Sequence, residues 1–224
     1  MYNEPIIICG FSGIGKTTIV RSRHDILDLE SSEFSETEYT LSGLVRRNEN
    51  FPANYIQTLD TIIDNNTKFK YILLSCHASV RQALQRAGHD YVIAMPAGEG
   101  IKDEYIRRWT QRKSSFQFID RMSQDWVKML CSCWNDDAPK IFIKPDHYLS
   151  DIVSVLESEG DDICTVKAKL NCFDERVKLL IVQGYSDDEI ANLLQCNSDR
   201  IIGIRRRILR KEKVKDENST RGLQ

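Results

Sequence analysis

The stretch Gly10-Phe11-Ser12-Gly13-Ile14-Gly15-Lys16-Thr17 matches the phosphate-binding pattern G-x-x-x-x-G-K-[ST] at every fixed position. In such a loop, glycines let backbone N–H groups converge on phosphate oxygens, the lysine reaches the β- and γ-phosphates, and the hydroxyl binds Mg²⁺. The pattern therefore predicts ATP and Mg²⁺ as cofactors. The residues predicted to bind the nucleotide are Gly10, Ser12, Gly13, Ile14, Gly15, Lys16, Thr17 and Thr18.

The flanking residues have the order that such a loop needs. Residues 5–9 form a short apolar run typical of a buried parallel strand, and residues 17–20 can begin a helix. A glycine turn that matches the pattern by chance is the alternative, and the strand, loop and helix order disfavours it.

A second strand is expected at residues 26–32, where Asp28, Glu30 and Ser31 follow an apolar start. Parallel strands present ligand-binding groups at their carboxyl ends, so these side chains should lie beside the loop. Asp28 could hold Mg²⁺ through water or accept a proton from the phosphate acceptor, and Glu30 could share either role. We expect Glu30 and Ser31 near the acceptor; the alternative is that all three are strand-end and turn residues.

The third expected strand, residues 71–77, ends in Ser-Cys-His where many nucleotide-binding proteins of this kind have an aspartate, which leaves Asp28 as the acid. His77, at this strand end, and Arg81, in the helix that follows, are predicted to face the acceptor. So is Arg46, in the weakly patterned polar stretch 33–53. The alternatives are a structural histidine and solvated surface arginines.

Residues 102–113 are strongly helical and rich in arginine, and Arg108 and Arg112 lie four residues apart on one face. Arginines on a closing segment often neutralise charge in phosphoryl transfer, so both are predicted to act in catalysis with Lys16 and Asp28. A salt-bridged surface helix is the alternative. A second helix is expected over 116–134, with an apolar stripe typical of a core.

Two more strands are expected at 91–96 and 140–145, and a closing helix at 148–156. Five short strands alternating with helices predict an α/β fold with a five-stranded parallel sheet flanked by helices, complete near residue 157.

Several stretches of residues 5–155 resemble the P-loop nucleotide kinase-like proteins of bacteriophages and prophages, often described as nucleoside monophosphate or adenylate kinase-like. They are GFSGIGKTT, LDLESSEF, FPANYI, YILLSCHASVRQAL, DEYIRRWTQR and the FID…W stretch. The resemblance implies the P-loop NTPase fold of nucleoside monophosphate kinases, with a helical lid at about residues 97–125. The Ser-Cys-His strand end is also similar in character to gluconate-type kinases, which keeps a non-nucleotide acceptor open.

A second domain is expected at residues 173–213, after a polar linker at 158–172 and before a disordered tail at 214–224. Three helices are expected, the second capped by Ser186 with Glu189 three residues on, and the third capped by Ser198. The string GYSDDEIANLLQCNSDRIIGIRRRI resembles the helix-turn-helix of response regulators and sigma factors.

Residues 200–213 carry seven basic residues against one acidic residue, although the whole chain has a net charge of −2. This asymmetry predicts nucleic acid as a partner of residues 173–213. The residues predicted to contact it are Arg200, Arg205, Arg206, Arg207, Arg210 and Lys211. A helical protein-docking or oligomerisation module is the alternative; helix-turn-helix proteins often act as dimers, yet no heptad pattern here supplies an interface.

No run approaches about 18 apolar residues, so we expect no membrane contact and a cytoplasmic protein whose seven scattered cysteines are reduced. The leading hypothesis is an ATP- and Mg²⁺-dependent phosphotransferase acting on a nucleotide or nucleoside-type acceptor, which could be a modified base in DNA. The alternatives are a nucleotide-sensing DNA-binding regulator without transfer activity and a small-metabolite kinase of the sugar-acid type.

Overall fold

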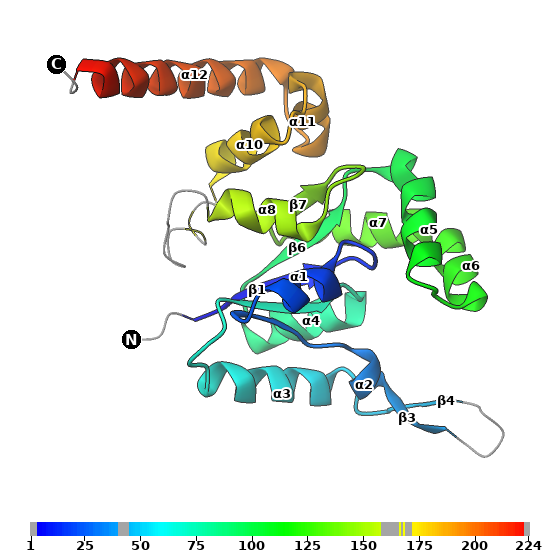
Figure 1. The fold of residues 1–224 in the computed structure, drawn as a ribbon. Coiled ribbons are helices and arrows are strands. Elements are labelled where there is room, and N and C mark those ends of the chain that lie inside the picture. The colour runs from blue at the N-terminus through cyan, green and yellow to red at the C-terminus, as the bar shows by residue number, and fades with distance from the viewer. Residues whose placement is uncertain (1–3, 40–44, 158–165, 167, 169–171, 222–224) are drawn as a thin grey trace. The chain divides into compact units, whose positions relative to one another are not determined.

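The computed structural model describes residues 4–39, 45–157, 166, 168 and 172–221, and no side chains for 37–39, 45–46 and 211–221. The chain forms two compact units, residues 1–164 and 165–224 (Figure 1). The boundary between the two units falls inside the polar stretch that the sequence analysis predicted to be a linker.

The first unit is built on a five-stranded sheet in which every strand pair is parallel. Its strands are β1 (Ile6–Gly10), β2 (Ile26–Asp28), β5 (Tyr71–Ser75), β6 (Tyr91–Pro96) and β7 (Lys140–Ile143), in the order β2-β5-β1-β6-β7. Their apolar runs are almost completely buried, as expected for a sheet covered on both faces. The predicted parallel sheet is therefore confirmed, although β2 ends at Asp28, earlier than expected.

Helices cover both faces of the sheet (Figure 1). They are α1 (Lys16–Ser22), α3 (Ala53–Asp64), α4 (Ala78–Ala87), α5 (Lys102–Gln111), α6 (Phe116–Gln124), α7 (Trp126–Trp134) and α8 (Leu149–Leu156), with a 3₁₀ turn at Glu99–Ile101 before α5. Helices α1 and α8 pack against each other, and α3 packs against α4. Right-handed crossovers between parallel strands put these two pairs on opposite faces.

Two local expectations are corrected in this unit. The stretch 33–53 contains a short helix α2 (Ser32–Ser35) and an antiparallel hairpin, β3 (Glu36–Tyr39) with β4 (Val45–Arg47), which projects from the body in Figure 1. The single helix expected over 116–134 is two helices, because Asp125 ends α6 and precedes α7.

The second unit contains α10 (Phe173–Val182), α11 (Asp187–Leu193) and α12 (Ser198–Arg221). Apolar side chains from all three helices form its core, among them Leu180, Ile190 and Ile204. The predicted capping box is present, because Ser186 Oγ accepts from the Glu189 amide and the Glu189 carboxylate accepts from the Ser186 amide. Helix α12 continues to Arg221, into the segment 214–224 that the sequence analysis expected to be a disordered tail.

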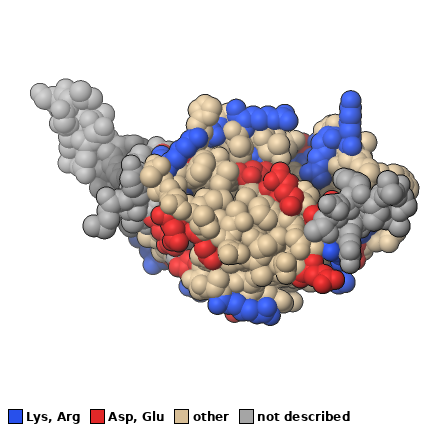
Figure 2. Space-filling view, turned by 90° about the horizontal axis from the view of Figure 1, so that it is seen from below, with Lys and Arg blue, Asp and Glu red and all other residues tan. Residues whose placement is uncertain are grey.

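Within the described residues, no helix is long and apolar enough to cross a membrane. On the face shown in Figure 2, acidic and basic side chains of the described residues lie in small separate groups rather than in one field of a single sign.

Candidate functional site

The glycine loop, residues 10–17, joins the central strand β1 to helix α1 at the carboxyl edge of the sheet. Gly10 is paired with Ser75 of β5 on one side and with Ala94 of β6 on the other. Because Asp28 ends β2, which pairs with β5, the ends of three strands bring the loop, Asp28 and Ser75 to one edge. This is the edge at which open parallel sheets bind ligands.

The backbone of the loop needs glycine at two positions. Gly13 and Gly15 have φ angles of 91° and 96°, in the left-handed region that side chains disfavour. A Cβ on Gly13 would lie 2.9 Å from Trp109 Nε1, and one on Gly15 would lie 3.1 Å from the Tyr148 ring. Among the described residues, none accepts a hydrogen bond from the amides of residues 13–17, so these donors remain available.

Three residues at the start of α1, Lys16, Thr17 and Thr18, present polar groups beside this loop. The Lys16 ammonium turns back and donates to the Gly10 carbonyl, with 3.3 Å between Nζ and O. Thr17 and Thr18 are exposed. The loop therefore offers a cation, two hydroxyls and free amides to one neighbourhood.

Asp28 faces this neighbourhood with an unsatisfied oxygen. Its Oδ1 is buried and has no hydrogen-bond partner in the described structure. Burial raises the pKa of Asp28, helped by the charge of Glu30, and the Lys16 ammonium and a hydrogen bond with the Thr17 hydroxyl oppose the rise. A buried carboxylate oxygen without a donor calls for a proton, a water or a cation.

The residues that the structure describes contain no cluster of three or more His, Cys, Asp or Glu side chains that could hold a metal. Mg²⁺ needs no such cluster, because it is commonly held by one or two protein oxygens, together with water and substrate phosphates. Thr17 and Asp28 are a donor set of that kind, and the unpartnered Asp28 oxygen fits it.

Arg108 braces the loop from α5. Its side chain is only 5% exposed and donates from Nε to Glu104 (2.8 Å), from Nη1 to the Gly13 carbonyl (3.2 Å) and from Nη2 to the His147 carbonyl (2.9 Å). The guanidinium also stacks on the Tyr148 ring, 4.3 Å from its centroid. In this structure the donors of Arg108 hold the loop in place, and its neutralisation of the transferred group stays a prediction.

Arg112, one turn further along the chain, has a different environment. It donates from Nη2 to Ser12 Oγ (3.0 Å) and from Nε to Ser114 Oγ (2.7 Å). Burial lowers the pKa of Arg112, and the charge of the Glu30 carboxylate opposes this. Arg112 therefore reaches the loop through a neutral hydroxyl, and its role in catalysis stays a prediction.

The other residues predicted to lie near the acceptor have different environments. Ser31 is buried, and its carbonyl accepts from the amides of Phe34 and Ser35 in α2. Glu30 is exposed and acts electrostatically on Asp28. His77 precedes α4, and burial together with the charges of Arg121 and Lys16 lowers its pKa. The side chain of Arg46 lies outside those described.

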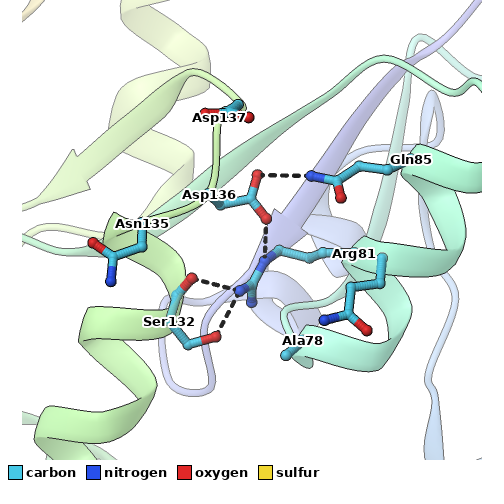
Figure 3. Close-up of a pocket in the computed structure, with 8 residues that line it drawn as sticks. Ala78, Arg81, Gln85, Ser132, Asn135, Asp136 and Asp137 are labelled. Atoms are coloured by element: carbon cyan, nitrogen blue, oxygen red, sulfur yellow. Dashed lines mark hydrogen bonds and ion pairs between the residues drawn. The ribbon is translucent and has the colours of Figure 1, made fainter.

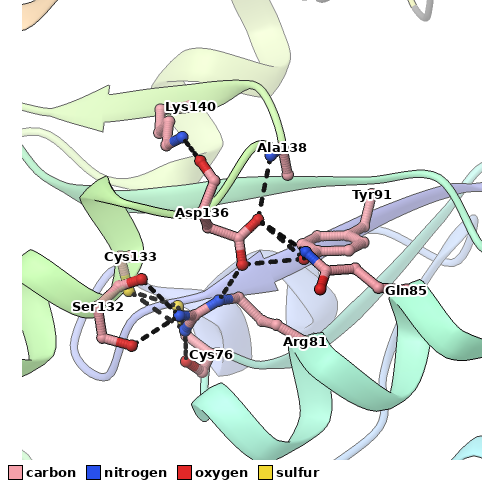
Figure 4. Close-up of polar contacts among 9 residues, drawn as sticks. All are labelled: Cys76, Arg81, Gln85, Tyr91, Ser132, Cys133, Asp136, Ala138 and Lys140. Carbon is pink, nitrogen blue, oxygen red and sulfur yellow. Dashed lines mark hydrogen bonds and ion pairs between the residues drawn. The ribbon is translucent and has the colours of Figure 1, made fainter.

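Arg81 is the clearest error among these predictions. It is 3% exposed and pairs with Asp136 at 2.8 Å, and its other donors reach the carbonyls of Cys76 and Ser132 (Figure 4). The guanidinium is therefore a structural link between α4 and the end of α7 and does not reach an acceptor.

A pocket of about 260 Å³ lies beside Arg81 (Figure 3). Its lining comes from α4 and the end of α7: Ala78, Arg81, Gln82, Gln85, Ser132, Asn135, Asp136 and Asp137. None of these residues belongs to the glycine loop. Because Asp136 already neutralises Arg81 and Asp137 adds a negative charge, this pocket does not suit a triphosphate.

Sequence reasoning missed two side chains at the site. Trp109 Nε1 donates to the Ser12 carbonyl at 3.2 Å, and Arg121 of α6 acts electrostatically on His77. In the sequence Trp109 looks like one more residue of a helix, and nothing in the local pattern around Arg121 distinguishes it from a surface charge.

No family model matches this sequence, and no curated protein matches it at a significant level. The function is therefore argued from the site alone.

In the second unit, the basic residues of α12 are not equivalent. Arg205 donates to Asp187 (2.5 Å) and to the Tyr185 carbonyl (2.8 Å), so it joins α12 to the start of α11. Its predicted contact with nucleic acid stays a prediction. Arg200 is exposed and stacks on Phe173, 3.8 Å from the ring centroid, and Arg207 pairs with Asp174.

Two further basic positions of α12, Arg206 and Arg210, have exposed side chains. The side chain of Lys211 lies outside those described. The exposed basic residues in the described part of α12 are thus Arg200, Arg206, Arg207 and Arg210.

Proposed function

We propose that this protein is an ATP- and Mg²⁺-dependent phosphotransferase with a C-terminal helix-turn-helix that binds nucleic acid. The observation that carries the first half is the complete phosphate-loop motif at the carboxyl end of the central strand, next to the unsatisfied carboxylate oxygen of Asp28. Loop, cation and acid are the parts that phosphoryl transfer needs at one place.

In this proposal each group has a separate task. The amides of residues 13–17 and the Lys16 ammonium bind the β- and γ-phosphates, and Thr17 and Asp28 hold Mg²⁺, which when bound neutralises phosphate charge. Arg112 approaches from the side of Ser12 and stabilises the charge of the transferred group. Arg108 and Trp109 hold the carbonyls of Gly13 and Ser12, so that the loop is already shaped for its ligand.

The acceptor would lie near Glu30, His77 and Arg121. Their mixed charges and the depressed pKa of His77 suit an acceptor that carries both a hydroxyl and an anionic group, as a nucleotide does. A hydroxyl on a modified base in DNA is a more specific form of the same proposal, because the second unit would then deliver the polymer.

The test is transfer of labelled γ-phosphate from ATP to nucleoside monophosphates, sugar acids and DNA with hydroxymethylated bases. Lys16→Ala should abolish labelling, and Lys128→Ala, an exposed lysine of α7, should leave it unchanged. Label on one acceptor class names the substrate. Label on sugar acids alone would favour the small-metabolite kinase.

The rival function, a nucleotide sensor that transfers nothing, has its own readout. ATP binding should alter tryptophan fluorescence, because Trp109 donates to the Ser12 carbonyl of the loop. Fluorescence change with no labelled acceptor, together with DNA affinity that depends on ATP, would replace the kinase proposal by the sensor.

The proposed nucleic-acid interaction rests on the exposed arginines of α12. Replacing Arg206 and Arg210 by alanine should weaken binding to duplex DNA and lower the slope of log K against log salt by about one for each DNA phosphate that is no longer neutralised. Arg207→Ala, which also breaks the exposed pair with Asp174, serves as the comparison at a partly neutralised position. An affinity for duplex DNA that changes neither with salt concentration nor with these substitutions would contradict the proposal.

A further inference from the structure

Two thiols face each other where the end of β5 meets α7. Cys76 directly follows β5, and Cys133 lies in the last turn of α7; their sulfurs are 3.2 Å apart (Figure 4). Cys133 is 2% exposed, whereas Cys76 is partly exposed to solvent. Fifty-seven positions separate them in the chain, so only the packing of α7 beside the β5–α4 junction brings them together.

A cation lies against this pair. Arg81 Nη1 is 3.5 Å from Cys133 Sγ and 3.9 Å from Cys76 Sγ, and it also donates to the Cys76 carbonyl at 2.5 Å. Asp136 holds the other side of the guanidinium at 2.8 Å, which fixes its position. A guanidinium beside a thiol favours the thiolate, and Asp136 offsets part of this effect.

We propose that Cys76 and Cys133 are a redox-active pair that closes to a reversible disulfide when the protein meets hydrogen peroxide. The sulfurs need to approach by only about 1.2 Å to reach the length of an S–S bond. The proposal does not rest on the proposed phosphotransfer, because none of these groups belongs to the glycine loop.

The electrostatics of the two thiols agree with this chemistry. A hydrogen bond from Cys76 and the charge of Arg81 lower the pKa of Cys133, although its burial and Asp136 oppose this. The same hydrogen bond and burial raise the pKa of Cys76, so that Cys76 is the proton donor of the pair. Lys140 also favours the Cys133 thiolate, and nearby Cys9 stays a thiol because complete burial raises its pKa.

The reaction consumes one peroxide and releases two waters. The thiolate sulfur attacks one peroxide oxygen, the O–O bond breaks, and the departing hydroxide takes up a proton, which leaves a sulfenic acid. The sulfur of the second cysteine then attacks the first: the S–S bond forms, the S–O bond breaks, and the hydroxyl leaves as water with the second thiol's proton. The sulfurs together lose two electrons, and a dithiol reductant restores them.

The product would link the β5–α4 junction to α7. Cys76 lies between Ser75, which pairs with Gly10, and His77. The disulfide therefore forms one residue away from two positions of the candidate site.

The test uses the full-length, reduced protein and hydrogen peroxide. After treatment, the protein is denatured, free thiols are alkylated and the digest is mapped by mass spectrometry without reduction. We expect a peptide pair joined through Cys76 and Cys133, a fall in alkylated cysteines from seven to five, and a return to seven after dithiothreitol.

Substitutions separate this pair from the other cysteines. Cys76→Ser should abolish the link, and Cys131→Ser, at an exposed position two residues from Cys133, should leave the link intact. Seven alkylated cysteines after a treatment that oxidises a free-cysteine peptide in the same tube would overturn the proposal. Links through the exposed Cys131 or Cys172 in place of Cys76–Cys133 would also overturn it.

Discussion

Replacing Arg108 by lysine tests whether Arg108 holds the glycine loop in place or contacts the transferred phosphate. The guanidinium donates in three directions, to Glu104, to the Gly13 carbonyl and to the His147 carbonyl. A lysine keeps the positive charge, but its single nitrogen cannot reach three acceptors that surround a planar fork. The substitution therefore removes geometry and retains charge.

The size of the effect follows from the hydrogen bonds that lysine cannot make. If lysine keeps one of the three, two buried charge-assisted hydrogen bonds disappear, at about 1.5 kcal/mol each, or about 3 kcal/mol of unfolding free energy. With a urea m-value of about 2 kcal/mol/M, the midpoint should fall by about 1.5 M. All three tryptophans lie in residues 1–164, so fluorescence follows this unit alone.

The same variant should bind ATP more weakly in native buffer. If about half of that free energy is needed to hold the Gly13 carbonyl, the affinity falls about tenfold. Arg107→Lys is the matched control: Arg107 lies in the same helix and pairs with Glu104 and Asp146, but its side chain is 55% exposed. Its replacement should change neither quantity appreciably. If the Arg108→Lys protein keeps its urea midpoint and its ATP affinity but no longer transfers phosphate, Arg108 does not act by holding the loop in place.

Two further predictions concern the same edge of the sheet. Gly13→Ala should destabilise the first unit by about 2–3 kcal/mol. The left-handed φ costs about 1–2 kcal/mol for a residue with a side chain. The new Cβ, 2.9 Å from Trp109 Nε1, also displaces the hydrogen bond from Trp109 to the Ser12 carbonyl, worth about 1 kcal/mol. Gly88→Ala has a similar φ of 79° with open space around it, so it should lose only the conformational part; equal losses in the two variants would rule out the close approach to Trp109 as a cause. His77 should titrate by NMR below its ordinary value of 6.5, and Arg121→Gln should raise the midpoint by removing a positive charge. Because the pKa of His77 is lower in the folded protein than in the unfolded chain, the free energy of unfolding should fall as the pH drops from 6.5 through the folded pKa. His77→Gln should remove that loss. A His77 titration midpoint that does not change in Arg121→Gln would contradict the assigned influence of Arg121 on His77.

The sheet could be predicted from the sequence because its strands are short apolar runs with polar ends. Residues 71–75 and 91–96 are buried at nearly every position, so no alternation is needed to recognise them. The β3–β4 hairpin carries no such signal: its strands are polar, only four and three residues long, and pair with each other outside the main sheet. Polar two-stranded ribbons leave little hydrophobic pattern to read.

The break between α6 and α7 escapes sequence reasoning for a different reason. The apolar positions Met122, Trp126 and Leu130 follow a helical spacing without interruption, and all three are buried. Asp125, with φ −84° and ψ 4°, ends one helix and precedes the next while this buried stripe continues. Periodicity reports which residues are buried, and here both helices bury the same stripe.

The arginines show where sequence reasoning about the site stops. Arg81, Arg108 and Arg205 are all predicted from the sequence to contact ligands, and each pairs with a carboxylate inside its own unit. For Arg81 that carboxylate, Asp136, is 55 positions away in the sequence, so no local pattern contains the information. An arginine that has its counter-charge inside the fold has less to gain from a phosphate, because binding the anion would leave a carboxylate uncompensated.

The same reasoning identifies Arg112 as the arginine most able to bind an anion at the loop. The side-chain partners that it contacts in the described structure are the hydroxyls of Ser12 and Ser114 and the ring of Phe118, whose centroid lies 5.1 Å from the guanidinium carbon, and none of them carries a charge that cancels its own. Glu30 acts on it electrostatically and forms no ion pair with it within 4.0 Å among the described residues. The phosphate-loop motif and the uncompensated charge of Arg112 therefore converge on the same end of the sheet, although they come from segments about a hundred residues apart.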